Sequence, residues 1–264
     1  MKKLIPALCM LLVAAALLGT STFAWFSMTT QVTASGMTVK AATSKNLVIS
    51  TTSTLKDNEG ISKDSTISQV KILTPASTAT LAGTQKFFTT DNENINYGDG
   101  AMKAGTVVSA VTPITDNTTE KGNVVKHTFY IRADGADTDS FAKLYVESIT
   151  LTSQAAAITK ALRVGVVSGD KGYIYAPVSG ATTSYKGLVK AETYTVGDTN
   201  QVLSTENVTL TTVGSVDATL GAVTSTAYTQ VDVYIWYEGQ DENCTSANAV
   251  TVEETSISIV FKAV

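Results

Sequence analysis

The chain has 264 residues with 23 acidic and 19 basic side chains, which gives a formal net charge of −4 at pH 7. The lysines and arginines are scattered along the sequence, so there is no basic stripe of the kind that binds a phosphate backbone. Nucleic acid is therefore excluded as an expected partner. With one histidine and two cysteines, the chain also has few of the side chains on which metal centres and hydrolytic sites depend.

The N-terminal residues have the pattern of an export signal. Two lysines precede an almost unbroken apolar stretch over residues 4–19, which is shorter than the roughly 20 residues of a membrane-spanning helix. Thr22 and Ala24 supply the small side chains of a cleavage site before Trp25. We therefore expect residues 1–24 to be a signal peptide and residues 25–264 to be a secreted or cell-surface domain. An uncleaved N-terminal anchor is the alternative, and membrane contact is expected only through such a leader.

Cleavage leaves Cys244 as the only cysteine, and an intramolecular disulfide is then excluded. The fold must be held together by packing. A lone thiol in a secreted protein is usually a buried small residue, and pairing between molecules is the alternative.

The clearest strand pattern covers residues 125–132. Residues 125–132 alternate with period two, which predicts a half-buried strand with Val125, His127, Phe129 and Ile131 on one face and Lys126, Thr128, Tyr130 and Arg132 on the other. A second strand is predicted over residues 141–151, with Ala142, Leu144, Val146 and Ile149 facing the core. The spacing lengthens between Val146 and Ile149, which predicts a bulge near Ser148.

Two further strands follow towards the C-terminus. In residues 231–238 the aliphatic face carries Val231, Val233, Ile235 and Tyr237, and the opposite face carries Asp232, Tyr234, Trp236 and Glu238. This mixed aromatic and acidic face is typical of a sandwich strand near a wet surface. The last strand is predicted from the alternation of Ile257, Ile259, Phe261 and Ala263.

Only residues 154–162 have helical character, and strand character resumes at residues 164–167. Clusters of glycine, aspartate and asparagine predict turns at residues 57–60, 91–100, 134–139, 169–172 and 197–200. Many strands at irregular spacing predict an all-β fold, a β-sandwich of jelly-roll or immunoglobulin-like type with one short helix and long insertions. Residues 46–115 are weakly patterned, which leaves insertions and a second small domain as alternatives.

The sequence offers little for catalysis, so we expect no enzyme, no cofactor and no metal site. His127 is the only histidine, and its place among apolar residues on one strand face favours a core histidine. Asp134, Asp137 and Asp139 could gather around calcium, but a solvated turn between two strands explains the same residues and is the favoured interpretation. Three Asn-x-Thr triplets, at Asn117, Asn207 and Asn243, are frequent by chance in a threonine-rich chain.

The segment around the cleavage site carries a family resemblance. Gly19, Thr20, Thr22, Phe23, Ala24, Trp25 and Phe26 match the glycine, threonine and aromatic-alanine cluster that ends the leaders of signal-peptidase-W substrates. The chain resembles the TasA/camelysin group of Gram-positive biofilm matrix fibre subunits over about its first forty residues. Camelysin-like members are described as metallopeptidases, and the single histidine argues against that activity here.

The resemblance implies assembly by donation of an N-terminal strand to the sheet of the next subunit. Residues 25–41 would be the donor strand, with Trp25, Phe26, Met28 and Val32 as assembly residues, and Gly36 would allow a bend before Met37. The alternative for this segment is an ordinary first strand in its own domain.

These observations lead to three functional hypotheses. The first is a structural subunit of an extracellular fibre or biofilm matrix that associates with copies of itself. The second is a surface adhesin or glycan-binding module that uses exposed aromatics such as Tyr173, Tyr175 and Trp236. The third, a secreted peptidase, ranks last because metal ligands are scarce.

Overall fold

The computed structural model of the chain describes residues 32–33, 37–43, 46–67, 72–81, 86–90, 108–119, 121–152, 157–188, 207–244, 248 and 255–264. Within these ranges the regular structure is β-strand, apart from one short 3-10 helix, η1 (Ala157–Ala161). This confirms the predicted all-β sandwich class.

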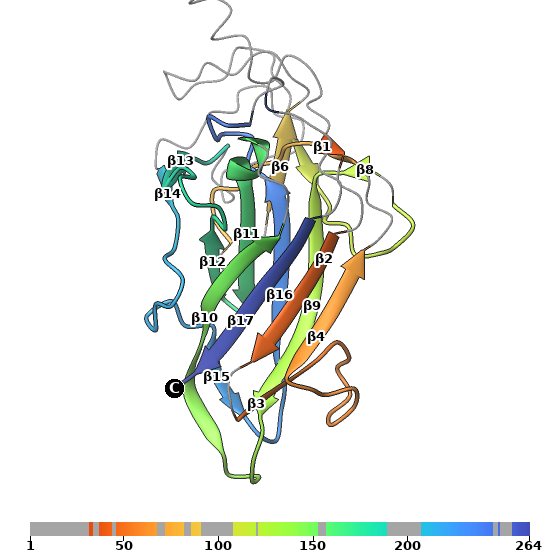
Figure 1. Cartoon of the computed structure of the whole chain (residues 1–264), viewed down its shortest axis with the longest axis vertical. Coiled ribbons are helices and arrows are strands. Elements are labelled where there is room, and N and C mark those ends of the chain that lie inside the picture. Colours follow the sequence, from red (N-terminus) through yellow and green to blue (C-terminus); the bar gives the residue numbers. More distant parts are fainter. Residues whose placement is uncertain are drawn as a thin grey trace, which may run out of the picture.

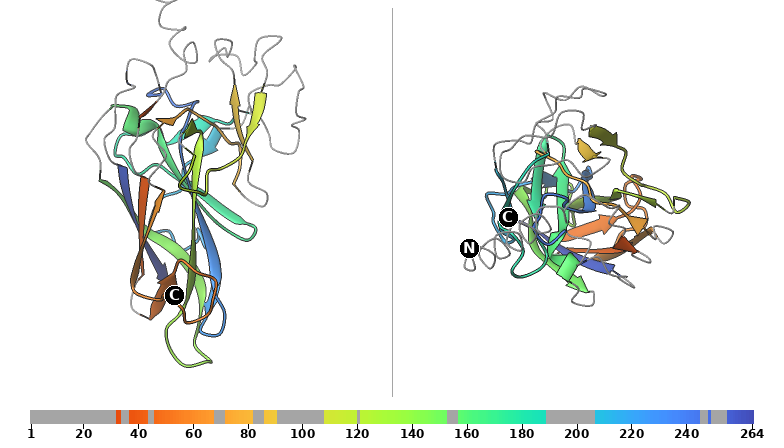
Figure 2. Two further views of the ribbon diagram at one scale, coloured as in Figure 1. Left: turned by 90° about the vertical axis from the view of Figure 1, so that its right-hand side faces the viewer. Right: turned by 90° about the horizontal axis from the view of Figure 1, so that it is seen from above.

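Two five-stranded sheets form the body of the molecule and lie face to face (Figures 1 and 2). Sheet I has the order β15 (Gly221–Thr224), β10 (Ser140–Thr152), β17 (Thr255–Ala263), β2 (Met37–Thr43) and β4 (Ser62–Ile67). Sheet II has the order β12 (Lys171–Tyr175), β11 (Leu162–Ser168), β16 (Thr229–Tyr237), β9 (Val124–Ala133) and β3 (Leu47–Ser50).

The main hydrophobic core fills the space between the two sheets. Its members come from alternate positions of the strands, as expected when one face of each strand is buried. They include Met37, Val39 and Ala41 of β2, Ile257, Ile259 and Phe261 of β17, and Val231, Val233 and Ile235 of β16. The alternation predicted for residues 125–132, 231–238 and 257–263 therefore identifies the inward face correctly.

Short strands gather at the upper end of the sandwich in Figure 1. They form a three-stranded sheet of β1 (Val32–Thr33), β5 (Ile72–Leu73) and β8 (Lys121–Gly122), and two strand pairs. One pair is β6 (Phe87–Thr90) with β7 (Val108–Val111), and the other is β13 (Ser184–Lys186) with β14 (Asn207–Thr209).

A second hydrophobic core lies on the outer face of sheet II. Tyr234 and Trp236 of β16 contribute to it, with the Phe87 ring centroid 5.4 Å from that of Tyr234 and 5.1 Å from that of Trp236. The expectation of a wet aromatic face at residues 231–238 is therefore wrong for these two side chains, which are buried. Alternation separates the two faces of a strand, but it does not show that Ala76, Leu81, Phe87 and Val111 cover the second one.

Strand β10 is interrupted twice. The register with β17 shifts between Val146 and Ser148, which confirms the bulge predicted near Ser148. A second shift, between Phe141 and Leu144, occurs against β15. It turns Ala142 outward, so the predicted inward position of Ala142 is wrong, and Phe141 packs against the core instead.

The helix and turns agree with the sequence where they are described. Helix η1 lies inside the predicted segment 154–162, and β11 begins at Leu162. Turns or bends occur within residues 57–60, 134–139 and 169–172. The turns predicted at residues 91–100 and 197–200 lie outside the described residues.

Candidate functional site

Trp25, Phe26 and Met28, which are predicted from the sequence to be assembly residues, lie outside the described residues. Val32 lies in β1, where it is paired with Leu73 of β5, and Thr33 is paired with Ile72. Residues 37–41 of the predicted donor segment lie in β2.

Strand β2 occupies an interior position in sheet I. It is parallel to β17, with Met37 opposite Thr255 and Thr43 opposite Phe261, and antiparallel to β4. The other pairings within the two large sheets, over the part of the chain that is described, are antiparallel. The C-terminal part of the predicted donor segment thus lies in a sheet of its own chain. Among the described strands, β2 is the only neighbour of β4 in that sheet.

The connection from β2 to β3 is short and crosses from sheet I to sheet II. Only residues 44–46 lie between Thr43 and Leu47. Asn46 has φ of 71°, in the left-handed region, and its carbonyl accepts a hydrogen bond of 2.7 Å from the backbone N–H of Asp134. A non-glycine residue in this conformation is uncommon, although asparagine tolerates it better than most.

Edge strand β4 is fastened to sheet II by the only histidine of the chain. A hydrogen bond of 2.8 Å joins His127 Nδ1 of β9 to Ser65 Oγ of β4. The ring is buried, and its Nε2 has no partner among the described residues. Burial lowers the pKa of His127 to about 4, so the imidazole is neutral under ordinary conditions. His127 is therefore a core residue, as the strand pattern favours.

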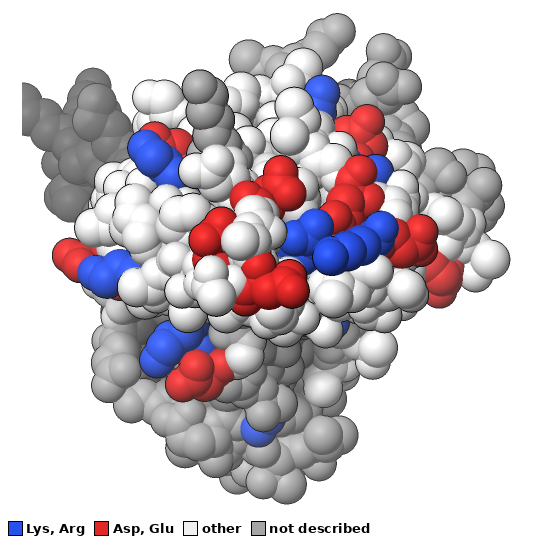
Figure 3. All heavy atoms as spheres, turned by 90° about the horizontal axis from the view of Figure 1, so that it is seen from below, with Lys and Arg blue, Asp and Glu red and all other residues white. Residues whose placement is uncertain are grey.

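The three aspartates weighed as calcium ligands lie at the end of the sandwich opposite the short strands (Figure 1). Asp134 and Asp139 line a cavity of about 340 Å³ together with Asn46, Ser140 and Phe141. Asp139 accepts a hydrogen bond of 3.0 Å from the backbone N–H of Ala136, as in a solvated turn. Acidic and basic side chains are interspersed at this end (Figure 3), and no group of three or more metal-binding side chains occurs among the described residues.

A buried charged cluster is the main feature that the sequence does not reveal. Arg163 of β11 is paired with Asp241, and neither side chain is exposed. Glu238, at the end of β16, is also fully buried. Its carboxylate accepts hydrogen bonds from Trp236 Nε1 at 3.0 Å and from the backbone N–H of Gln240 at 2.9 Å.

Cys244 borders this cluster. The thiol is free and buried, as expected for a lone cysteine. Burial raises the pKa of Cys244, and the nearby Glu238 and Asp241 raise it further. The thiol is thus protonated and shielded in the folded chain.

The aromatics considered for glycan binding are mostly inaccessible. Trp236 and Tyr175 are buried, so their expected exposure is wrong. Tyr173 is half-buried, and its hydroxyl donates a hydrogen bond of 3.1 Å to the carbonyl of Thr219.

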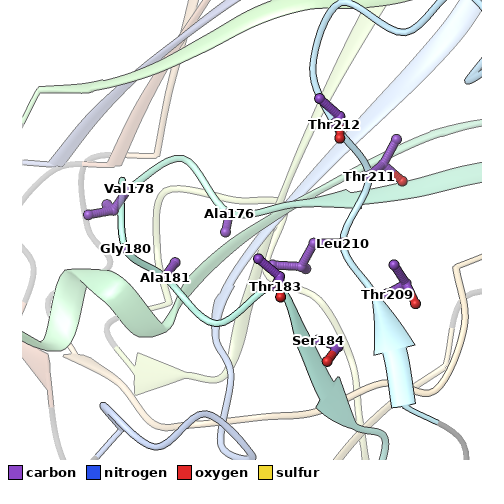
Figure 4. Close-up of a pocket in the computed structure, with 10 residues that line it drawn as sticks. All are labelled: Ala176, Val178, Gly180, Ala181, Thr183, Ser184, Thr209, Leu210, Thr211 and Thr212. Carbon is purple, nitrogen blue, oxygen red and sulfur yellow. The ribbon is translucent and has the colours of Figure 1, made fainter.

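A larger pocket, of about 510 Å³, opens between residues 176–184 and residues 209–212. Its lining contains Ala176, Val178, Gly180, Ala181, Thr183, Ser184, Thr209, Leu210, Thr211 and Thr212. In Figure 4 the Leu210 side chain points toward Thr183, whereas Thr209 and Thr211 extend from the other side of their segment. The lining is uncharged and contains no aromatic ring, and its hydroxyls do not converge on one point.

The sequence matches no family model, and no curated protein or solved structure is significantly similar to it. Among the described residues, no helix has both the length and the apolar character needed to cross a membrane.

Proposed function

We propose that the chain is an exported structural subunit of an extracellular fibre or surface matrix, and that it assembles by exchanging its N-terminal strand with copies of itself. The observation that supports this most directly is the position of β2. This strand follows the mature N-terminus, yet it is inserted between β17 and β4.

Exchange of β2 conserves its contacts. Met37, Val39 and Ala41 are fully buried, and burial of each large apolar side chain contributes about 1.5–3 kcal/mol. A sheet I without β2 would expose a row of apolar side chains and the unpaired edges of β17 and β4. The gap is filled equally well by the strand of the same chain or of a neighbour, as in domain swapping.

The topology makes the exchange inexpensive. Because β2 lies near the N-terminus of the mature chain, it can leave without drawing a loop through the sheet. The connection at residues 44–46 must rearrange and β1 must separate from β5, and opening the connection releases Asn46 from its left-handed conformation. Short connections of this kind favour swapped forms over closed monomers.

The buried titratable groups support a structural role. His127 is bonded to Ser65, Arg163 is paired with Asp241, and Glu238 is enclosed by the second core. Each of these side chains holds two segments of the fold together, and none lines either of the two cavities described above.

The apolar residues ahead of β1 extend the proposed donor segment. Trp25, Phe26 and Met28 precede the first described strand, and in an exchanged strand they would anchor the segment on the receiving subunit. Large aromatic side chains gain most from such burial.

Electron microscopy and light scattering of the mature chain, residues 25–264, test the proposal. We expect fibres or large oligomers from this chain and monomers from a chain that lacks residues 25–35. Replacement of Trp25, Phe26 and Met28 by serine should slow assembly strongly, whereas the matched control with Ser27, Thr29 and Thr30 changed to alanine should assemble normally. Monomers under all conditions, or a deletion that assembles like the parent, would end the proposal.

A further inference from the structure

Residues 72–78 connect strand β1 to the buried charged cluster of Arg163, Glu238 and Asp241. At one end, Ile72 and Leu73 form β5 and are the described partners of β1. Three residues later the same segment is fastened to the end of β16. There the backbone N–H of Ala76 donates to the carbonyl of Tyr237 at 3.0 Å, and the N–H of Gly239 donates to the carbonyl of Ala76 at 2.9 Å.

Glu238 lies at the centre of this attachment. It sits between Tyr237 and Gly239, at the position that pairs with Ala76 of the fastened segment. The hydroxyl of Ser77 lies near enough to lower the pKa of this carboxyl slightly, but it is buried without a hydrogen-bond partner in the described structure. Tyr185 of β13 faces the same carboxylate from another side. Glu238 thus contacts the segment that holds β1 and the strands that cover it.

The charges around Glu238 do not compensate its ionised form. The facing titratable groups are Arg163 of β11, Asp241 and Cys244 of the following turn, and Tyr185 of β13. Arg163 is already paired with Asp241, and its Nη1 donates to the carbonyls of Lys160 at 2.8 Å and Leu162 at 3.0 Å. A second carboxylate charge is therefore in excess in a fully buried cluster.

Some polar atoms around the cluster also lack hydrogen-bond partners. Arg163 Nε and both polar atoms of the Gln240 side-chain amide are buried without a hydrogen-bond partner in the described structure. Unsatisfied buried polar groups are costly and favour local opening. A charge on Glu238 would add to this cost at the point where Ala76 is bonded to the end of β16.

We propose that ionisation of Glu238 detaches residues 72–78 from β16. This detachment frees β1 and thereby allows β2, which follows β1 in the chain, to leave its own subunit. This inference rests on the proposed strand exchange and adds its regulation. In mildly acidic solution the closed subunit persists, and assembly begins when the pH rises.

The direction of the pH dependence follows from the chemistry of the Glu238 carboxyl group. Burial raises the pKa of Glu238 from its ordinary 4.5 to about 7, despite hydrogen bonds and the Arg163 charge that act in the opposite direction. The closed form therefore retains a proton that the opened form loses. The stabilisation of the closed form is complete below about pH 4.5 and is lost as the pH rises through about 7.

The thiol of Cys244 provides a reporter that does not require assembly. It is the only cysteine of the mature chain and is buried beside Glu238. Its labelling rate at low protein concentration, divided at each pH by that of the unfolded chain, measures local opening. Between about pH 5.5 and pH 8 we expect the corrected rate to rise about 10- to 30-fold, which is the change that the altered proton affinity allows.

Glu238→Gln keeps the shape of the side chain and removes its charge, so its labelling rate should be independent of pH. The matched control is Glu59→Gln, at the opposite end of the sandwich. Glu59 also fastens a loop, but the Arg132 hydrogen bond lowers its pKa, so this variant should keep the parent's rise near pH 7. A corrected rate for the parent chain that stays constant from pH 5.5 to 8 overturns the proposal, and this measurement requires no variant.

Assembly kinetics at the two pH values separate this inference from the proposed function. We expect the parent to assemble faster at pH 8 and Glu238→Gln to assemble slowly at both. If the labelling rate rises but no pH produces oligomers, the strand exchange fails and the release of residues 72–78 stands. If oligomers form equally fast at both pH values, the regulation by Glu238 is wrong and the exchange stands.

Discussion

His127 and Glu238 are two buried titratable residues with opposite effects on stability. Burial lowers the pKa of His127 from 6.5 to about 4 and raises that of Glu238 from 4.5 to about 7. Each change spans about 2.5 pH units, equivalent to about 3 kcal/mol. The histidine stabilisation is present above pH 6.5 and is lost as the pH falls through 4, whereas the glutamate stabilisation is lost as the pH rises through 7.

These two effects should largely cancel between about pH 4.5 and 6.5. We expect the free energy of unfolding of the parent chain to be nearly constant across this window, as measured by urea denaturation. His127→Gln should reveal stability that falls with rising pH, and Glu238→Gln should reveal stability that rises. If both variants keep the flat profile of the parent, the protonation states assigned to the two side chains are wrong.

The two residues differ in how well the sequence predicts them. His127 shares an alternating strand face with Phe129 and Ile131, so its burial follows from a local pattern. Arg163 and Asp241 are 78 positions apart, and nothing in their neighbourhoods indicates that they meet. Glu238 lies on the face opposite Ile235 and Tyr237, which the local pattern assigns to solvent.

At the scale of elements, glycines decide how closely the covering segment approaches sheet II. A Cβ added to Gly172 of β12 would lie 2.5 Å from the carbonyl oxygen of Leu81, a backbone atom that cannot move alone. At Gly165 of β11 the nearest atom would be Leu81 Cδ1. Residues 78–81 therefore require glycine beneath them in order to reach the second core.

Gly172→Ala should destabilise the fold by about 1–3 kcal/mol, the usual cost of overpacking. The matched control is Gly60→Ala, whose added Cβ would make an ordinary contact of 3.5 Å with Lys63 Cε. That change should be neutral or slightly stabilising because it restricts the unfolded chain. Urea denaturation of both variants checks this, and equal effects would show that Leu81 does not pack on Gly172.

Elements could be predicted from the sequence where one pattern governs them. The lengthened spacing between Val146 and Ile149 indicates the bulge in β10, and both ends of β17 are close to those expected. The second irregularity of β10, at Ala142, is set by its pairing with β15 and has no local signal. The parallel pairing of β2 with β17 joins segments more than two hundred residues apart. Hydrophobic alternation predicts which face of a strand is buried, but it does not predict which strand lies beside it.

On the scale of the whole molecule, the sandwich class follows from composition and alternation, while the order of the strands does not. Many half-buried strands must be covered by a second layer, and two packed sheets satisfy this need. The outer face of sheet II is covered in part by Ala76, Leu81 and Phe87, which come from a part of the sequence whose own pattern is weak. The prediction that Trp236 lies on a solvent-exposed face was wrong for this reason.

The central claim is that β2 exchanges between subunits, and a disulfide across its edge tests it most directly. Thr38 of β2 and Thr66 of β4 are opposite each other, with their hydroxyl oxygens 3.2 Å apart. Both can be replaced by cysteine in a chain of residues 25–264, whose only other thiol is the buried Cys244. Tyr130→Cys with Gln230→Cys, an opposed pair on β9 and β16, is the matched control because neither strand is exchanged.

Thr38→Cys with Thr66→Cys should respond to the order of oxidation. Oxidised as a monomer, the protein should be locked and unable to assemble until it is reduced. Oxidised after assembly, it should give a ladder of covalent oligomers on non-reducing gels, whereas the control pair gives only monomers. A locked monomer that assembles as fast as the reduced protein would contradict the exchange of β2. Assemblies that give only monomer bands after oxidation would contradict it as well, because the two introduced thiols would then have cross-linked within one chain.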